Sequence, residues 1–68
     1  MSTPEEAYAA RELLALATDF ERLAGSLAAE AVGPQSKRLR WHRIELSNTY
    51  RDCADRARER AVKLSSLG

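Results

Sequence analysis

The first candidates for chemistry in this 68-residue chain are its single cysteine and its single histidine. A cysteine nucleophile needs a histidine within hydrogen-bond reach. Cys53 follows His42 by eleven residues, which separates them by about 16 Å along one helix at about 1.5 Å per residue. The two side chains could therefore meet only between two copies of the chain. Within one copy, Cys53 is expected to pack as a small apolar residue.

The sequence also lacks the common metal-binding and phosphate-binding patterns. Carboxylate-bridged metal bundles use Glu-x-x-His facing inward, whereas residues 42–45 read His-Arg-Ile-Glu. Glu12 and Asp19 have no histidine nearby in the sequence, and the three glycines are isolated. One Cys and one His also fall short of a structural zinc site. We therefore predict a protein without a catalytic, cofactor or metal site, and not an enzyme.

Residues 37–43 read KRLRWHR and are the least neutralised part of the chain. Three interpretations of this basic segment are open: ion pairing with carboxylates such as Glu21 and Glu30, contact with a protein partner, or binding of nucleic acid. A protein interface favours Trp and Arg, and in a nucleic-acid site Trp41 could stack on a base. The net charge of only +1 disfavours nucleic acid. The candidate contact residues are Lys37, Arg38, Arg40, Trp41, Arg43 and Ile44.

Two helices must position these residues. The composition is rich in Ala, Leu, Arg and Glu, which are strong helix formers. Thr3-Pro4-Glu5-Glu6 is typical of a helix start, with Thr3 as the cap and Glu6 as the acid of a capping box. No breaker follows before about residue 32, so the first helix is expected over residues 4–32. Its apolar stripe, with alanines at heptad spacing along one edge, consists of Ala9, Leu13, Leu16, Phe20, Leu23 and Leu27.

Gly33-Pro34 predicts a turn over residues 33–35, in which Gly33 adopts the left-handed conformation that closes a helix. A second helix is expected over residues 36–64. Ser47-Asn48-Thr49 are poor helix formers, and a break there would give three helices. We favour one continuous helix, because the apolar phase crosses this segment without slipping. The apolar stripe of this helix consists of Leu39, Leu46, Tyr50, Cys53, Ala57, Ala61 and Leu64.

A short turn between two helices predicts an all-α antiparallel hairpin that forms a single domain. Charge is unequal between its halves: residues 1–33 carry a net −4 and residues 34–68 a net +5. A hairpin of this size buries little, and one cysteine allows no internal disulfide. Side chains outside the two stripes, including Leu14, Val32, Trp41, Ile44 and Val62, are expected to stay exposed. We therefore expect two hairpins to associate into a homodimeric four-helix bundle.

The expected seam of that bundle consists of Leu13, Leu16, Phe20, Leu23, Leu27, Leu39, Leu46, Tyr50, Cys53 and Leu64. The function predicted from the sequence is a small non-enzymatic interaction or regulatory module that acts as a homo-oligomer. For Trp41 the first expectation is a contact with the second copy of the chain. A heterologous protein bound through Trp41 and Ile44 is the next expectation, and nucleic-acid binding is the alternative function. No stretch has the roughly 20 apolar residues of a membrane span, and nothing resembles a signal peptide. A cytoplasmic location is expected, with Cys53 reduced.

Overall fold

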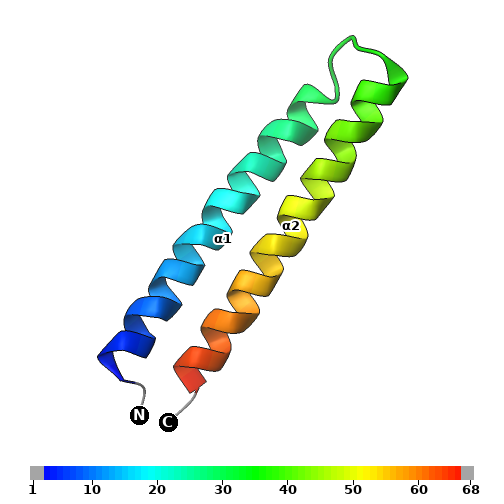
Figure 1. Cartoon of the computed structure of the whole chain (residues 1–68). Helices are drawn as coiled ribbons and strands as arrows, with labels where there is room; N and C mark the ends of the chain where they lie inside the picture. The colour runs from blue at the N-terminus through cyan, green and yellow to red at the C-terminus, as the bar shows by residue number, and fades with distance from the viewer. Residues whose placement is uncertain (1–2, 67–68) are drawn as a thin grey trace.

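The computed structural model describes residues 3–66, and these form two antiparallel α-helices joined by a short loop (Figure 1). Helix α1 spans Pro4–Glu30 and helix α2 spans Lys37–Ser66. At about 1.5 Å per residue the helices are about 40 and 45 Å long, and the molecule measures 52 × 13 × 11 Å. The all-α antiparallel hairpin predicted from the sequence is confirmed.

Helix α1 begins with the predicted capping box. The Thr3 hydroxyl accepts a hydrogen bond from the Glu6 backbone N–H at 3.1 Å, and the Glu6 carboxylate accepts one from the Thr3 N–H at 3.2 Å. Two backbone donors that the helix itself leaves free are thus satisfied. Pro4 occupies the start of the helix, where a missing N–H costs nothing.

The loop between the helices differs from the expected turn. The last α1 residue is Glu30, and Ala31 caps the helix with right-handed angles, φ −69° and ψ −15°. Gly33 does not adopt the expected left-handed conformation, so that prediction is wrong. Tight backbone bonds close the helix end instead, including one from the Gly33 N–H to the Glu30 carbonyl at 3.3 Å. The Gln35 amide also donates to the Glu30 carbonyl at 2.7 Å, so a side chain helps to close the helix end that Gly33 was expected to close.

Helix α2 starts after Ser36, whose hydroxyl accepts a hydrogen bond from the Leu39 N–H at 3.1 Å. The helix continues through Ser47-Asn48-Thr49 without interruption, which confirms the predicted continuity. The hydroxyl of Thr49 donates to the Glu45 carbonyl at 3.0 Å, a local bond that this residue type can make within a helix.

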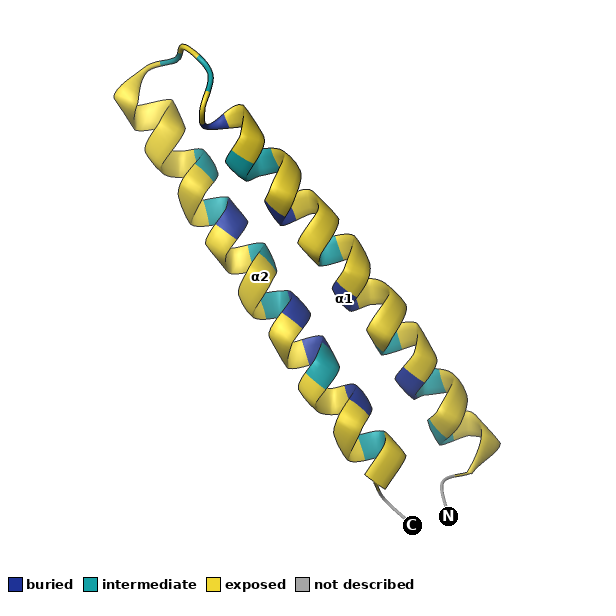
Figure 2. Cartoon of the chain, turned by 180° about the vertical axis from the view of Figure 1, so that it is seen from behind, coloured by how far each residue is buried: buried dark blue, intermediate teal, exposed yellow. Residues whose placement is uncertain are grey.

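Small side chains fill the contact between the two helices (Figure 2). Buried positions lie along the facing sides of α1 and α2, and Ala17, Ala54 and Ala57 form one buried cluster. Helical periodicity predicts leucines at the centre of the α1 stripe and alanines at its edge, and the structure reverses this order. Small residues let two backbones approach closely, which a leucine between them would prevent. The buried residues are Ala10, Ala17, Ala24, Ala31, Ser47, Ala54, Ala57 and Ala61.

Candidate interaction surfaces

Most of the larger apolar side chains of both helices lie on one side of the hairpin. On α1, Leu13 follows buried Ala10 by three residues, and on α2, Tyr50 follows buried Ser47 by three residues. Because the helices are antiparallel, an equal offset on each places these side chains on the same side of the pair. We call this side the leucine face, and it consists of Leu13, Leu16, Phe20, Leu23, Leu27, Leu39, Leu46, Tyr50, Cys53 and Leu64.

An aromatic pair connects the two halves of the leucine face. The rings of Phe20 on α1 and Tyr50 on α2 stack with centroids 5.9 Å apart and an interplanar angle of 24°. Leu13 and Phe20 also pack against the buried alanine cluster. Offset stacked aromatic pairs contribute about 0.5–1.5 kcal/mol beyond the area that they bury. The contact therefore holds the α1 and α2 parts of the face in register.

Much of the leucine face remains open to solvent. Leu16 and Leu23 are 44% and 48% exposed, and Leu39 is 41% exposed. Leu13, Phe20, Leu27, Leu46, Tyr50, Cys53 and Leu64 are half-buried. The structure thus brings the predicted seam residues together on one surface, but the hairpin alone covers that surface only in part.

The long edges of the leucine face carry opposite charge. On α1, Glu12 and Asp19 line a shallow hollow of about 260 Å³ together with Leu13 and Leu16. On α2, Arg56, Arg60 and Lys63 line a second, polar hollow together with the single acidic residue Glu59. At about 100° per residue, Arg60 lies on the same line as Cys53, and Arg56 and Lys63 border it. The acidic edge therefore belongs to α1 and the basic edge to α2.

The opposite side of the hairpin carries an ion pair between the helices as well as a hollow lined by apolar residues such as Leu14 and Val62. Arg58 and Glu21 form an ion pair between the helices, with the guanidinium and carboxylate 2.6 Å apart. The hydrogen bond from Arg58, together with its charge, lowers the pKa of the Glu21 carboxyl. The hydrogen bond to Glu21 correspondingly raises the pKa of the Arg58 guanidinium. Sequence reasoning missed this pair, because Glu21 was expected to face the basic segment instead.

In the basic segment at residues 37–43, one arginine forms an ion pair within the hairpin and other basic residues form none. Arg43 reaches across the loop, where its guanidinium donates to the Gln35 amide oxygen at 2.7 Å and lies 3.7 Å from the Glu30 carboxylate. Pairing between this segment and Glu30 is therefore confirmed for Arg43. Within residues 3–66, Lys37, Arg38 and Arg40 form no ion pair.

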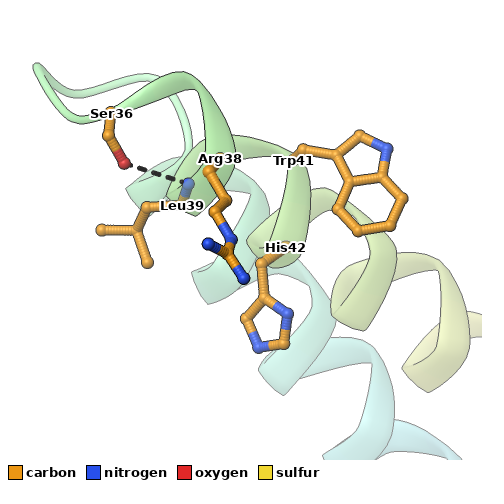
Figure 3. A pocket seen from close by; sticks show the side chains of 5 residues that line it. All are labelled: Ser36, Arg38, Leu39, Trp41 and His42. Carbon is orange, nitrogen blue, oxygen red and sulfur yellow. Dashed lines mark hydrogen bonds between the residues drawn. The ribbon is translucent and has the colours of Figure 1, made fainter.

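Trp41 lies on the outer part of this segment and is 63% exposed. It lines a shallow hollow with Ser36, Arg38, Leu39 and His42. In Figure 3 the indole points away from Leu39, while the Arg38 and His42 side chains lie between them. The hollow is open and contains both an aromatic ring and unpaired positive charge.

Ile44 follows Trp41 by three residues and is 44% exposed, so the two form a small apolar patch. The other side chains predicted to remain exposed, Leu14, Val32 and Val62, are 47%, 84% and 65% exposed, as expected. This patch is smaller than the leucine face and lies on a different side of α2.

The remaining chemical groups stay apart. Cys53 and His42 lie on the same helix three turns from each other, and Cys53 is a half-buried free thiol. Among residues 3–66, no three or more His, Cys, Asp or Glu side chains are grouped to hold a metal ion. No helix in the same part of the chain has the length and apolar character to cross a membrane.

Comparison with known proteins returns no relatives: no family model, no curated protein and no solved structure matches this chain.

Proposed function

We propose that this protein is a small non-enzymatic interaction module that acts as a homodimer, in which two hairpins join through their leucine faces to form a four-helix bundle. The observation that carries the proposal is the position of the large apolar residues. Alanines fill the contact inside the hairpin, while Leu16, Leu23 and Leu39 remain 41–48% exposed on one side. A homodimer would bury them against identical side chains.

The energetics of the hairpin support a partner on this face. No large side chain in residues 3–66 is fully buried. Burying a methyl group contributes about 0.8 kcal/mol, whereas fully burying a leucine or phenylalanine contributes about 1.5–3 kcal/mol. An alanine contact between two helices therefore provides only a small part of what a stable domain of this length needs. The leucine face offers Leu16, Leu23 and Leu39, which are 41–48% exposed, to a partner that would bury them.

The size of the molecule is compatible with such an interface. A stable protein–protein interface takes about 800 Å² from each partner, which is roughly 15% of the 5211 Å² of surface on this chain. The face runs along both helices of a molecule 52 Å long, so it is large enough for an interface of this size.

The proposal is tested by measuring molar mass with light scattering or sedimentation over a dilution series. The wild-type chain is expected to give the mass of two chains and to dissociate only on dilution. The double variant Leu16→Glu, Leu23→Glu places charges at the exposed centre of the face. It is expected to shift the protein to the monomer, because the charged side chains would lose water on association.

Val62→Glu is the matched control, because Val62 is more exposed than either leucine and lies away from the face. It is expected to leave the mass unchanged. A wild-type chain that is a folded monomer at every concentration would overturn the proposal. So would a Leu16→Glu, Leu23→Glu protein that dimerises as tightly as the wild type.

A heterologous protein partner at Trp41 and Ile44 is the next candidate for this module. It is favoured by the 63% exposure of Trp41, a residue type enriched at interface hot spots. A Trp41→Ala protein is expected to keep its own mass in solution and to lose a protein that the wild type retains. Dissociation of the homodimer by Trp41→Ala would instead place this residue in the contact between copies.

Nucleic-acid binding is the alternative function, and the unpaired Lys37, Arg38 and Arg40 beside Trp41 favour it. Because Trp41 is the sole tryptophan, quenching of the intrinsic fluorescence would report stacking on a base. Binding to phosphates must weaken steeply as salt rises. Arg38→Gln, Arg40→Gln should reduce binding, while Arg51→Gln, which is distant from the segment, should not. Absence of binding at low salt would remove this alternative.

This module is proposed to act in the cytoplasm, where a single half-buried thiol such as Cys53 remains reduced.

A further inference from the structure

We infer that the two copies in the dimer lie with both turns at the same end, so that α1 of each copy packs against α2 of the other. This inference rests on the proposed self-association and adds its geometry. Two hairpins can join face to face about a twofold axis in two ways. An axis parallel to the helices places α1 against α2 of the partner copy, while an axis across the helices places α1 against α1 and α2 against α2.

The charges along the leucine face distinguish these two arrangements. Glu12 and Asp19 lie beside Leu13 and Leu16 on the α1 edge. On the α2 edge, the three basic residues Arg56, Arg60 and Lys63 outnumber the one acidic residue of their hollow, Glu59. With the axis parallel to the helices, each acidic edge meets a basic edge. With the axis across the helices, acidic edges meet each other and basic edges meet each other. Like charges placed opposite one another at an interface disfavour association.

The register within the hairpin brings the two acidic residues of the α1 edge to within about one turn of basic residues on the α2 edge. The Ser47 hydroxyl donates to the Ala24 carbonyl at 2.8 Å, so residues 47 and 24 lie level across the contact. Ala17 and Ala54 share one buried cluster one heptad further along. Continuing this register places Glu12 level with Glu59, about one turn from both Arg56 and Lys63, and it places Asp19 level with Asp52, about one turn from Arg56. An axis parallel to the helices preserves these levels between the copies.

The charged groups of the two edges remain available for such contacts. Glu12, Arg56, Arg60 and Lys63 form no ion pair within residues 3–66. Asp19 makes only a 3.9 Å contact with Arg22, and its side chain is 64% exposed. By contrast, Glu21, Glu30, Arg43 and Arg58 already pair within the hairpin.

The arrangement has a consequence for the basic segment. With both turns at one end, the two copies of residues 37–43 lie at the same end of the bundle. The unpaired Lys37, Arg38 and Arg40 of each copy would then form one positively charged end with two exposed tryptophans.

A distance between the turns tests the arrangement directly. A spin label is attached to Val32→Cys, which is on the loop and 84% exposed in the wild type, in a Cys53→Ser chain. With both turns at one end, the two labels are expected within about 30 Å, because neighbouring helices in a bundle lie about 8–10 Å apart. A distance close to the 52 Å length of the hairpin, in a protein of dimeric mass, would overturn the arrangement and leave self-association intact.

Charge reversal gives an independent test in unlabelled protein. Glu12→Arg, Asp19→Arg is expected to weaken the dimer at least about tenfold, because basic groups would then face basic groups. Adding Arg56→Glu and Arg60→Glu to the same chain should restore most of the affinity. The control Glu45→Arg, Asp52→Arg makes the same charge change on the outer side of α2 and should not weaken the dimer, with circular dichroism verifying that each variant remains helical.

The outcomes separate the two proposals. If the turns lie at opposite ends, Glu12→Arg, Asp19→Arg replaces repulsion between two acidic edges by repulsion between two basic edges. The affinity of the dimer would then stay unchanged, and that result would contradict our arrangement. A wild-type chain with the mass of a monomer at every concentration removes self-association itself and the arrangement with it.

Discussion

At the scale of single residues, Ser47 shows how close the two helices are. Among residues 3–66 it is the one buried residue with a polar side chain, at 2% exposure. Its hydroxyl donates to the Ala24 carbonyl of the other helix. A hydroxyl can reach a backbone carbonyl of a neighbouring helix only where the intervening side chains are small. The alanines on either side of Ser47 in the contact provide that space, so each is sensitive to an increase in volume.

Ala54→Leu is expected to lower the free energy of unfolding by about 1–3 kcal/mol, because Ala54 is fully buried at the contact and the added atoms must force the helices apart. Chemical denaturation followed by circular dichroism would measure the change. Ala29→Leu adds the same atoms at an exposed position of α1 and should leave the stability nearly unchanged. Equal stabilities of the two variants would contradict a close alanine contact.

The Glu21–Arg58 pair predicts a pH-dependent contribution to stability. The hydrogen bond from Arg58 lowers the pKa of the Glu21 carboxyl in the folded chain. Folding is therefore favoured by this group above the carboxyl's unfolded pKa, and the contribution is lost as the pH falls through the lowered folded value. Arg58→Gln should return the Glu21 titration, followed by NMR, toward higher pH.

The matched control for this pair is Arg51→Gln, which removes a cation of the same helix that forms no ion pair in residues 3–66. Denaturation midpoints should differ between wild type and Arg58→Gln near neutral pH, and the difference should shrink in acid. A difference that stays constant through the titration of Glu21 would count against the pair.

At the scale of elements, both helices are fixed by local signals at their starts. Thr3 and Glu6 form a reciprocal capping box at α1, and Ser36 caps α2. The C-terminal end of α1 has no left-handed glycine to cap it. Tight backbone bonds and the Gln35 side chain satisfy its carbonyls instead. The loop is therefore held by side chains at residues 30, 35 and 43 as much as by its backbone.

Gly25 lies inside α1 where a larger residue would fit. A Cβ at this position would meet nothing within 4 Å, and alanine loses less backbone entropy than glycine when a helix forms. Gly25→Ala should therefore raise the free energy of unfolding by about 0.5–1 kcal/mol, measured by chemical denaturation. A destabilised Gly25→Ala protein would indicate that a neighbouring chain approaches α1 closely at this point.

At the scale of the whole molecule, the hairpin is long and thin, 52 × 13 × 11 Å, and its inner contact is made mainly of alanines. Two such helices cannot enclose side chains as large as Leu16 and Leu23. The proposed bundle would enclose them and would couple folding to association. In the proposed dimer each copy would cover the face of the other, and this symmetric use of the face would prevent an open chain of hairpins.

Coupled association predicts that thermal stability depends on protein concentration. The melting temperature of the wild type should rise as the chain concentration rises, because mass action favours a folded dimer over unfolded chains. Calorimetry over a hundredfold concentration range would measure the shift. Leu16→Glu, Leu23→Glu should melt lower and without this dependence, and a wild type that melts at one temperature throughout would contradict coupling.

Helix starts, helix continuity and the antiparallel hairpin followed from the sequence alone, because capping residues and apolar periodicity act over a few neighbouring positions. The Thr3–Glu6 capping box and the uninterrupted passage through residues 47–49 are examples. The same periodicity placed the ten residues of the leucine face in one predicted seam. It also predicted that Trp41 and Val62 are exposed in the hairpin, as they are.

Only the tertiary structure decided which of two adjacent stripes forms the contact inside the hairpin. Alanines and leucines on α1 both follow helical spacing, so periodicity alone could not rank them. The heptad spacing of Ser47, Ala54 and Ala61 on α2 was the available signal, since it matches the alanine series on α1. Which stripe forms the contact depends on both helices at once, because close approach of two backbones requires small residues on each. That condition brings Ala17 and Ala54 together and leaves Leu16 and Leu23 on the surface.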